Sequence, residues 1–464
     1  MKKKTIFILV ESVKRELDAK TLFALKAINK NYRVVIGHKG NVWNIFNRCN
    51  PGIVLLKSFG PNNTKIIDFL KTNKFVVYSN DEEIILAWDM KERIELRMKN
   101  ENLTKIDKIL TVGEVDTVEI KKQFPQVSNN IQKIGNLRLD LLKNKNSIYL
   151  EKEAKIIKEN YGDFILLASQ FSKVNVFRKT EDFIDFATSI IIRDKIPIKS
   201  KTAINLYDQI TMQREVLIEV LDFINNFEIN FPNKNLVISP HPVENKIFWK
   251  KYLSAKSFKN IYLNKFENFN TNSFIKACDF VISTNSTSLL EAFILEKKII
   301  NFLGKKSRDV EIGVLKQISN VVRSSEELNK LILNQNNITK FESSSELKNS
   351  IENLENIESI DLLLQTINKQ KNINSYDSIF ISPKISFNTY LLNKFREFKS
   401  DIKKVFNLRK NGLTFNDLLH KDKIGDNLTY SSYQNRVKNL NNIEKVENLK
   451  FEQILPEVFL LDKN

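Results

Sequence analysis

Short apolar runs separated by longer stretches of mixed polarity recur along the first third of the chain. One such stretch, Glu16–Ile28, places Leu17 and Leu25 near one face, which is the 3.6-residue period of an amphipathic helix. A second helix is predicted over Ile84–Lys99. The apolar runs predict strands at Thr5–Val10, Arg33–Gly37, Gly52–Leu56, Phe75–Ser79, Lys108–Val112 and Ile131–Gly135. Strands that alternate with helices predict a parallel sheet of βαβ units.

The same alternation begins again near Asp163. Residues 172–211 interrupt it, and because they are basic and irregular we interpret them as an insertion or a loop at the edge of a cleft. Gln213–Phe227 has a helical pattern. Further strands are predicted at Phe164–Leu167, at the runs containing Leu236, Ile261 and Phe280, and at Lys298–Phe302.

These patterns predict an α/β protein with two doubly wound parallel-sheet domains, at residues 1–150 and 151–335. From about Asn334 the composition changes to Asn, Ser, Lys and Glu. Residues 336–464 are therefore interpreted as a polar, mainly helical extension. In open sheets of this kind ligands bind at the carboxyl ends of the strands, so polar residues at those ends are the candidates for a site.

Two polar motifs follow predicted strands in the second half. In LVISPHPVEN, His241 follows a strand and Pro242 and Glu244 belong to the same turn. In DFVISTNSTSLLEAF, a strand and a turn lead into a helix predicted over Thr287–Leu295. The candidates in this motif are Ser283, Thr284, Ser286, Thr287, Ser288 and Glu291. Free N–H groups, hydroxyls and the helix dipole favour a phosphate there.

Both motifs also have a purely structural interpretation. A His-Pro pair is common in turns with a solvated ring. Ser288–Glu291 fits a capping box, S-x-x-E before an apolar run, which stabilises a helix without any ligand. The order of the motifs favours function, because His241 follows one strand and the hydroxyl cluster follows the next strand but one.

Carboxylates stand at two predicted strand ends in the first half. Glu11 closes the first strand, and Asp81, Glu82 and Glu83 follow the fourth. A carboxylate that faces a cleft from a strand end is suited to act as a general base. The alternative is that the three consecutive acidic residues are the charged first turn of the helix at Ile84, favoured by its dipole.

Polar residues also mark the junction between the two halves. Asn136, Arg138 and Asp140 close the first half, and Gln170 lies in the polar turn after the first strand of the second. Asn136 and Arg138 are candidates for contacts with a donor substrate or for a hinge. The alternative is that Gly135 simply ends a strand.

Composition excludes several classes of protein. A chain of 464 residues that is 42% hydrophobic can form two full cores. Cys49 and Cys278 lie far apart without C-x-x-C spacing, which argues against a disulfide scaffold or zinc site and indicates a reducing compartment. The apolar run after MKKK is too short for a signal peptide, and no run approaches the ~20 residues needed to cross a bilayer. We therefore expect a cytoplasmic protein.

The formal net charge of +18 favours polyanionic partners. The sequence lacks RNA-recognition aromatics, zinc fingers and a helix-turn-helix pattern, so nucleic acid is not expected. Residues 391–410 form a basic amphipathic pattern that either packs on the protein, which we favour, or lies on an anionic membrane surface. No G-x-G-x-x-G follows the first strand and no D-x-D separates a strand from a loop, so neither a dinucleotide nor a metal is expected.

Three stretches resemble the bacterial surface carbohydrate biosynthesis protein family: VESVKRELDAKTLFALKAI, KIGNLRLDLL and FILLASQFSKVN. The resemblance covers residues 5–305. It implies the GT-B glycosyltransferase architecture, in which two doubly wound domains face each other across a cleft. The first domain would then bind the acceptor and the second the nucleotide sugar.

A more distant similarity is to bacterial sialyltransferases and Kdo transferases of the GT-B type. Their acidic motif, His-Pro pair and Ser/Thr pair would here be Asp81-Glu82-Glu83, His241-Pro242 and Ser286-Thr287. This similarity implies that one carboxylate deprotonates the acceptor hydroxyl, that the histidine stabilises the leaving phosphate and that the hydroxyl pair binds it. Ile84 stands where the acidic motif of those families ends in Gly, so Glu11 is a rival for the base.

The expected function is a metal-independent glycosyltransferase of capsule or lipopolysaccharide biosynthesis. It would use a nucleotide-activated sugar as co-substrate, with a CMP-linked sugar as the candidate donor, and it would need no cofactor. The acceptor would be a glycan or a lipid-linked molecule at the inner face of the cell membrane. One alternative is a sugar-nucleotide 2-epimerase, although acidic residues and glycines of that pattern are replaced here by Ser283–Thr287. A polyol-phosphate transferase of the teichoic-acid type is another, although its Asp-Tyr before the serines is missing. A non-catalytic, membrane-associated assembly protein is the third.

Overall fold

The computed structural model describes residues 1–143, 145–175, 201–266, 269–305, 310–355, 357–381 and 428–463. The chain forms two compact units: unit 1 contains residues 1–85, 93–141 and 350–464, and unit 2 contains residues 86–92 and 142–349. The sequence predicted boundaries at 150 and 335 and a separate extension. The structure instead assigns the segment from Ser350 onward to unit 1. The predicted basic helix at 391–410 lies outside the described residues.

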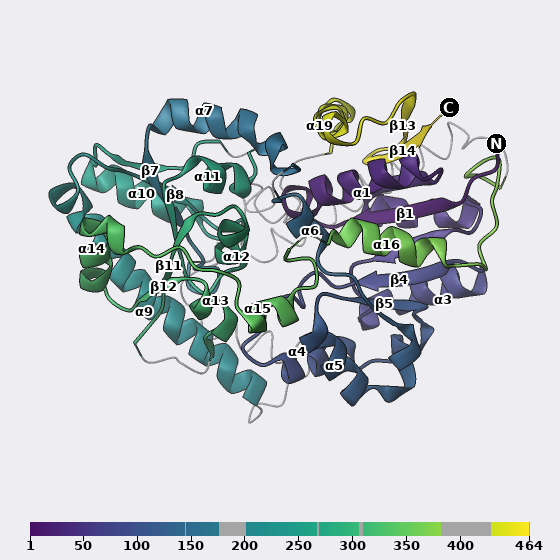
Figure 1. Ribbon diagram of the computed structural model, residues 1–464, viewed down its shortest axis with the longest axis horizontal. Coiled ribbons are helices and arrows are strands. Elements are labelled where there is room, and N and C mark those ends of the chain that lie inside the picture. The colour runs from purple at the N-terminus through teal and green to yellow at the C-terminus, as the bar shows by residue number, and fades with distance from the viewer. Residues whose placement is uncertain are drawn as a thin grey trace, which may run out of the picture. The chain divides into compact units, whose positions relative to one another are not determined.

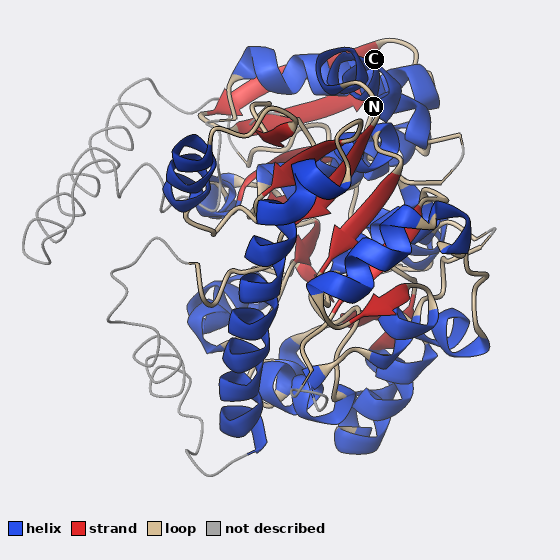
Figure 2. Ribbon diagram, turned by 90° about the vertical axis from the view of Figure 1, so that its left-hand side faces the viewer, coloured by secondary structure: helices blue, strands red, loops and turns tan. Residues whose placement is uncertain are grey.

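Unit 1 is built on an eight-stranded sheet in the order β13-β14-β2-β1-β3-β4-β5-β6. Its parallel strands are β1 (Thr5–Val10), β2 (Arg33–His38), β3 (Ile53–Leu56), β4 (Val76–Asn80), β5 (Lys108–Thr111) and β6 (Ile131–Lys133). The sequence predicted each of them to within one or two residues at either end. Every residue of β1 and β3 is buried, because helices flank the strands, and this explains their continuous apolar runs (Figure 2).

The helices that connect these strands are α1 (Asp18–Asn29), α2 (Lys39–Trp43), α3 (Thr64–Thr72), α4 (Met90–Met98), α5 (Glu114–Gln123) and α6 (Leu137–Asp140). A π-helical turn over Val13–Leu17 precedes α1, so the helix predicted from Glu16 is divided between two elements. The helix predicted from Ile84 begins only at Met90. The acidic motif that follows β4 therefore lies in a loop and not in the first turn of a helix.

The C-terminal segment completes unit 1. Helices α16 (Ser359–Asn368) and α19 (Tyr430–Glu444) lie in this segment, and the hairpin of β13 (Leu449–Leu455) and β14 (Val458–Lys463) adds to β2 in antiparallel register. Figure 1 shows α19, in yellow, beside α1. Arg436 of α19 donates to Asp18 of α1 at 2.8 Å, and the Tyr433 hydroxyl lies 3.2 Å from that of Thr21. The C-terminal segment thus supports the helix that follows β1.

Unit 2 contains a six-stranded, fully parallel sheet in the order β12-β11-β10-β7-β8-β9. The strands are β7 (Phe164–Ala168), β8 (Asn235–Ser239), β9 (Ile261–Leu263), β10 (Phe280–Ser283), β11 (Lys298–Phe302) and β12 (Asn320–Val322). The helices are α7 (Glu151–Tyr161), α9 (Lys201–Asn230), α10 (Lys246–Lys256), α11 (Thr271–Ala277), α12 (Thr287–Ile294), α13 (Gly313–Gln317), α14 (Ser325–Leu333) and α15 (Ser345–Ser350). A parallel second sheet agrees with the sequence.

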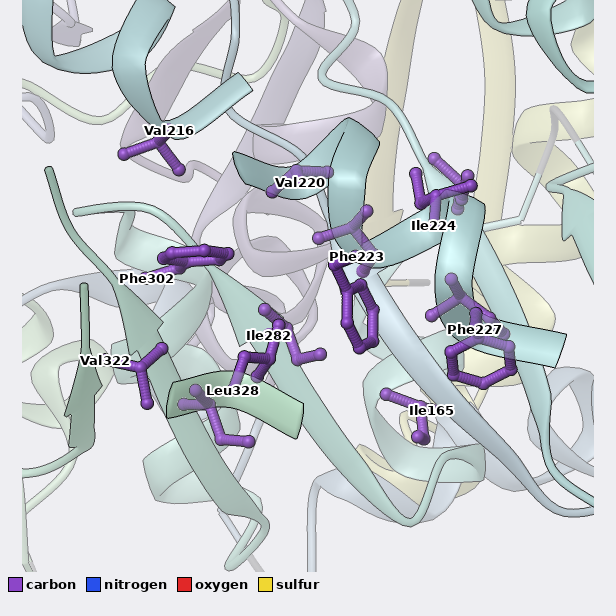
Figure 3. Packing of buried hydrophobic residues seen from close by; sticks show 14 of the residues in the cluster. Ile165, Val216, Val220, Phe223, Ile224, Phe227, Ile282, Phe302, Val322 and Leu328 are labelled. Atoms are coloured by element: carbon purple, nitrogen blue, oxygen red, sulfur yellow. The ribbon is translucent and has the colours of Figure 1, made fainter. Parts of the chain in front are cut away.

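The long helix α9 corrects one prediction. Residues 201–211 were expected to be irregular, but they form the start of α9; residues 176–200 lie outside the described part. Val216, Val220, Phe223 and Phe227 recur on one face of α9 with helical spacing, and all four are buried. Figure 3 shows them packed in a cluster that includes Ile282 of β10. This packing fixes α9 on the sheet.

Both sheets have a point at which the direction of strand addition reverses. In unit 1 it lies between β1 and β3, and in unit 2 between β7 and β10. Ligands in open α/β sheets bind at the carboxyl ends of the strands beside such a point. The residues that follow these strands are therefore the first candidates for a functional site. No helix among the described residues combines the length and apolar character required to cross a membrane.

Candidate functional site

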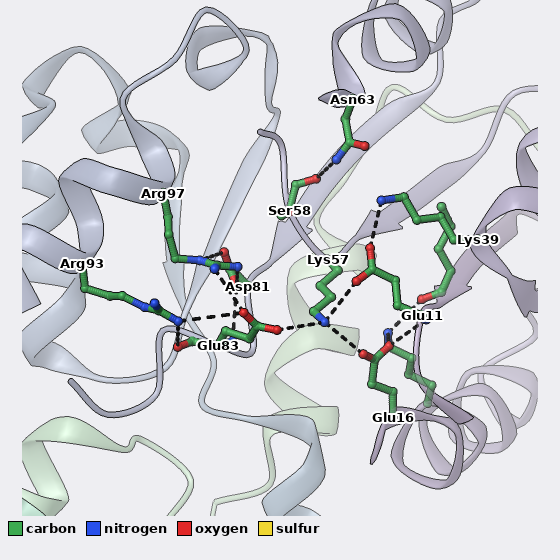
Figure 4. Close-up of polar contacts among 12 residues, drawn as sticks. Glu11, Glu16, Lys39, Lys57, Ser58, Asn63, Asp81, Glu83, Arg93 and Arg97 are labelled. Carbon is green, nitrogen blue, oxygen red and sulfur yellow. Dashed lines mark hydrogen bonds and ion pairs between the residues drawn. The ribbon is translucent and has the colours of Figure 1, made fainter. Parts of the chain in front are cut away.

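A single lysine links three carboxylates at the reversal point of unit 1 (Figure 4). The Nζ atom of Lys57, directly after β3, lies 3.1 Å from Glu11, which follows β1. It also lies 3.2 Å from Glu16 of the π-helical turn and 3.2 Å from Glu83, which follows β4. Lys39 pairs with the other oxygen of Glu11 at 2.9 Å. Four loops and turns are thus joined by ion pairs at one edge of the sheet.

Asp81 is held by an arginine of α4. Arg97 donates to Asp81 through Nε at 2.6 Å and through Nη2 at 2.8 Å, which is a bidentate pair. Its Nη1 atom donates to Glu83 at 3.1 Å. Figure 4 shows both contacts, and Arg93 approaching Glu83 from the same helix. Asp81 therefore anchors the loop between β4 and α4, and its oxygens are occupied by a permanent cation.

Glu82 differs from its two acidic neighbours. Its side chain is only 4% exposed, and its Oε1 atom is buried without a hydrogen-bond partner among the described residues. Burial raises the pKa of Glu82, and although the positive charge of Lys20 opposes this, the negative charge of Glu16 adds to it. A buried carboxyl with a raised pKa and a vacant oxygen is suited to take up a proton.

The three carboxylates that pair with Lys57 have lowered pKa values. Burial alone would raise the pKa of Glu16, but the ion pairs with Lys20 and Lys57 lower it to about 2. The same balance of burial against Lys57 and Arg97 lowers the pKa of Glu83 to about 2. Burial alone would also raise the pKa of Glu11, but Lys39 and Lys57 outweigh this effect and lower it. Glu82 is thus the carboxyl of this cluster whose pKa moves toward neutrality.

Sequence reasoning named Glu11, Asp81 and Glu82 as candidates but did not include Lys57, Lys20 or Glu16 as site residues. Lys20 donates to Glu16 and to the backbone oxygen of Leu9, both at 2.8 Å. One signal for Lys57 was present, since it directly follows an apolar strand. The signal for Glu16 was hidden because it looked like an ordinary residue in an amphipathic helix.

The two motifs of unit 2 lie on one edge of its sheet. Ala168, the last residue of β7, pairs with Ser283 of β10 on one side and with Ser239 of β8 on the other. The three strands therefore end level with one another. His241 follows β8 by two residues and Thr284 directly follows β10, so both start from this level edge.

Glu244 has a structural role in place of the predicted phosphate contact. It is buried and accepts hydrogen bonds from the Ser169 hydroxyl at 2.9 Å, the Phe171 backbone at 2.8 Å and the Trp249 indole at 3.0 Å. The backbone N–H of His241 also donates to it, at 3.3 Å. Glu244 therefore ties the loop after β7 to the loop after β8, and burial raises the pKa of its carboxyl, although these hydrogen bonds oppose the rise.

His241 is half-buried in the loop that Glu244 holds. Its Nδ1 atom accepts a long hydrogen bond of 3.4 Å from the backbone N–H of Val243. When Nδ1 is an acceptor, the proton of a neutral imidazole is on Nε2, and Nε2 becomes the donor. The ring can thus donate a hydrogen bond to an anion through Nε2. Pro242, beside it, is exposed.

Ser286 caps the helix that follows β10. Its hydroxyl accepts from the backbone N–H of Ser288 at 3.3 Å, so α12 begins at Thr287. The S-x-x-E pattern at Ser288 therefore does not form the capping box that was the structural alternative. Asn285, in the left-handed region with φ of 48°, holds the turn by donating to Val310 at 2.7 Å and accepting from Ile312 at 2.9 Å. The helix N-terminus is thereby fixed at the level strand edge.

Two residues of the predicted hydroxyl site face the interior. The Ser283 hydroxyl donates to the backbone oxygen of Ala168 at 2.6 Å, which is a contact between strands, and Glu291 is buried on α12. Thr284 is buried as well, whereas Thr287 and Ser288 are partly exposed. Thr287 and Ser288 are therefore the more exposed hydroxyls of the predicted phosphate site, whereas Ser286 is buried and caps α12.

The junction residues have different environments. Asp140 is fully buried and accepts from the Asn353 amide at 2.6 Å and from the backbone N–H of Ile360 at 2.8 Å, so it is committed to internal contacts. Asn136 is buried with its Nδ2 atom unpartnered among the described residues. The positive charge of Arg138 acts on Glu82. Gln170, in unit 2, is half-buried and donates to Ser172 at 3.5 Å.

In the described part of the chain, no group of three or more His, Cys, Asp and Glu side chains could hold a metal ion. The buried carboxyl of Glu82 in unit 1 and the imidazole of His241 and the N-terminus of α12 in unit 2 are the candidate groups at the two strand edges.

No family model matches this chain, and no curated protein does. Among solved structures, a histidine-to-alanine variant of the wall teichoic acid polymerase TagF is similar at 11% identity and a TM-score of 0.50, over 79% of this chain and 88% of that one. UDP-GlcNAc 2-epimerase from Methanocaldococcus jannaschii is similar at 16% identity and a TM-score of 0.44, over 79% and 100%. A putative UDP-N-acetylglucosamine 2-epimerase from Listeria monocytogenes is similar at 12% identity and a TM-score of 0.46, over 79% of this chain and 96% of that one.

At these identities the similarity concerns the fold. Together with the two parallel sheets, it assigns the chain to the GT-B-like class of α/β architecture that the resemblance implied. One fold of this class hosts several chemistries, so the activity has to be argued from the residues.

Proposed function

We propose that this protein is a glycosyltransferase of bacterial cell-surface polysaccharide biosynthesis that uses a nucleotide-activated sugar. The observation that carries the proposal is Glu82, a buried carboxyl with a raised pKa and an unpartnered oxygen among ion-paired neighbours. Glycosyl transfer requires a proton acceptor for the incoming hydroxyl. The GT-B-like fold, which TagF shares, supports the class of reaction by analogy.

In the proposed reaction the oxygen of the acceptor hydroxyl attacks the anomeric carbon of the sugar, and Glu82 takes up the proton of that hydroxyl. The bond between that carbon and the donor phosphate breaks, and the phosphate oxygen leaves with the electron pair. A raised pKa makes Glu82 a stronger base than an ordinary carboxylate. Asp81 and Glu11, the other candidates, act by positioning, because their oxygens are paired with Arg97, Lys39 and Lys57.

Unit 2 is proposed to bind the leaving phosphate. His241 would donate a hydrogen bond through Nε2, and the N-terminus of α12, with the hydroxyls of Thr287 and Ser288, would supply N–H and O–H donors. Such donors stabilise the charge that develops on a departing phosphate without a metal. The proposed donor is a CMP-linked acidic sugar, in keeping with the distant similarity to sialyltransferases and Kdo transferases.

The acceptor and location extend the same proposal. A glycan or lipid-linked acceptor would be modified at the cytoplasmic face of the membrane. Residues 391–410 would be a peripheral contact there if they lie on the membrane surface, which is the alternative to the packing that their pattern favours. Those residues lie outside the described part of the chain, so this step rests on their sequence pattern alone.

Thermal unfolding with CMP, CDP, UDP and GDP tests the proposal. A nucleotide at 100 times its dissociation constant stabilises the folded state by about 2.7 kcal/mol. We expect CMP to raise the Tm of the wild type, His241→Ala to abolish that rise, and the control Lys250→Ala, exposed on α10 of the same unit, to retain it. Selective stabilisation by UDP would favour an epimerase, and by CDP a polyol-phosphate transferase. No shift with any nucleotide would contradict the proposal and favour the assembly protein.

A further inference from the structure

A depression of about 810 Å³ lies at the other edge of the unit 2 sheet, away from His241 and α12. It lies where β10 and β11 begin, at Phe280 and Lys298, whereas the proposed phosphate site follows the ends of the strands. The four residues of β10 span about 13 Å. The two edges are therefore separate places on unit 2.

Lysines from three elements line this depression. They are Lys155 and Lys158 of α7, Lys276 of α11, and Lys297 and Lys298 at the start of β11. The acidic lining residues are Glu151, Glu159 and Asp279, so the lining carries five positive charges and three negative ones. Two of the lysines are ion-paired, because Lys158 lies 2.8 Å from Asp163 and Lys155 lies 4.0 Å from Glu159. Figure 1 shows α7 and α11 next to each other in unit 2. Positive charge is thus gathered at this edge by elements that are far apart in the sequence.

The hydrogen bonds of Lys276, Lys297 and Lys298 do not occupy all the N–H donors of their ammonium groups. Lys297 donates to the backbone oxygen of Cys278 at 2.8 Å, Lys298 to that of Gln335 at 3.0 Å, and Lys276 to the Ser147 hydroxyl at 3.3 Å. Each of these contacts occupies one of the three N–H groups of an ammonium. The remaining N–H groups can be shared among the oxygens of one bound anion.

The lysines also repel one another. Burial lowers the pKa of Lys297, and the positive charges of Lys276 and Lys158 lower it further, although Cys278 and Asp279 oppose them. A cation with a lowered pKa beside other cations is stabilised by any anion that enters. Small and apolar residues, among them Ala154, Ala277 and Phe280, line the same depression, so a ligand can also have an apolar part.

We propose that this depression is a second anion site, which binds the phosphate group of an organic phosphate ester or diphosphate. Lysine binds phosphate as a compact point charge, and several lysines around one cavity suit an anion with several oxygens. The apolar lining would contact the organic part next to the phosphate. The inference is independent of the proposed transferase activity, since it concerns the opposite edge of the sheet.

Calorimetric titration with inorganic pyrophosphate tests the site. The test variant is Lys155→Gln/Lys276→Gln, and the matched control is Lys250→Gln/Lys251→Gln, which removes the same charge from the exposed face of α10. We expect the test variant to bind pyrophosphate about tenfold more weakly, because two charge-assisted contacts are lost. The control should bind as the wild type does. Equal binding by test variant and wild type, or equal losses in both variants, would overturn the proposal.

A second measurement identifies the source of the phosphate and guards against an unfolded variant. Wild type and Lys155→Glu, a single change at an exposed position, are sedimented with vesicles of phosphatidylglycerol or of phosphatidylcholine. Loss of phosphatidylglycerol binding in the variant assigns the site to a lipid headgroup. Weakened pyrophosphate binding without any vesicle binding assigns it to a soluble phosphate. If Lys155→Glu changes neither, the site is refuted.

Discussion

The side-chain amide of Asn353 is paired with the backbone of Asn136, 217 residues earlier in the chain. Its Oδ1 atom accepts from the Asn136 N–H at 2.8 Å, and its Nδ2 atom donates to the Asn136 carbonyl at 2.9 Å. The same Nδ2 atom donates to Asp140 at 2.6 Å. The segment that returns to unit 1 therefore holds the turn between β6 and α6, the short helix that carries Arg138.

Gly135 permits this pairing, and its replacement should be costly. Its φ is 91°, which disfavours other residues, and an added Cβ would lie 2.3 Å from Asn353 Oδ1. We expect Gly135→Ala to lower the free energy of unfolding by about 2 kcal/mol or more, measured by urea denaturation. Gly60→Ala is the control, since φ there is −56° and no atom lies within 4 Å. A cost as small as that of the control would contradict the role given to Asn353.

Replacing Glu82 by glutamine should separate catalysis from stability. We expect Glu82→Gln to lose about 100-fold or more of the transfer rate, as for other general bases, while the thermal shift with CMP is retained. In the wild type the rate should rise with pH, because the base has to be ionised. Asp81→Asn should instead lower the free energy of unfolding, because the bidentate Arg97 pair is lost. A fully active Glu82→Gln enzyme would leave Glu11 as the base.

The same variant gives a prediction for stability against pH. The pKa of Glu82 is raised in the folded state, so the folded protein loses stability as pH rises from the ordinary value of 4.5 through the raised one. Glutamine removes this titration. We therefore expect Glu82→Gln to be more stable than the wild type at neutral pH, with a difference that shrinks below pH 4.5. Urea denaturation of both proteins across this pH range measures the difference in the free energy of unfolding. Equal values at neutral pH would mean that ionisation of Glu82 does not destabilise the folded protein.

The parallel strands were predictable from sequence because both of their faces are buried, which leaves a continuous apolar run such as Thr5–Val10. The shared edge of His241 and Ser286 was predictable for a related reason. Each follows a parallel strand, and parallel strands in one sheet end on the same side. Local pattern and topology together were therefore sufficient for these features.

The rest depended on contacts between distant segments. Nothing near Lys57 indicates that it lies beside Glu11, Glu16 and Glu83, and the choice of Glu82 among three adjacent acids follows from burial and partners alone. Glu244 looked like a ligand because it stands beside His241 in sequence. Its carboxylate instead accepts from two loops and from Trp249 of α10, a set of contacts that a linear pattern does not contain.

Lys57→Met should destabilise unit 1, because it leaves three carboxylates beside one another without their shared cation. Removing one partner of a buried ion pair costs about 3 kcal/mol, and partial exposure of Glu11 and Glu83 makes this an upper figure. The control Lys99→Met removes an exposed pair with Glu95 and should cost less than about 0.5 kcal/mol.

The pH dependence of that loss has a definite sign. The pKa of Glu16 is about 2 in the folded state, so its stabilising effect is present above 4.5 and is lost as pH falls toward 2. The difference between wild type and Lys57→Met should therefore be largest near neutrality and decrease in acid. A difference independent of pH would show that Lys57 contributes by packing alone.

Glu244→Gln should weaken nucleotide binding without removing any group that contacts the nucleotide. Glutamine keeps the shape of the side chain but offers one acceptor oxygen, while its NH₂ group faces donors such as the Ser169 hydroxyl and the Trp249 indole. Each buried donor left unsatisfied costs about 1–3 kcal/mol. We expect a lower Tm and a weaker CMP affinity, because the His241 loop loses its anchor. Glu159→Gln, exposed on α7, should change neither, and calorimetry with CMP compares the three proteins. Unchanged CMP affinity in a destabilised Glu244→Gln protein would show that the His241 loop keeps its conformation without this carboxylate.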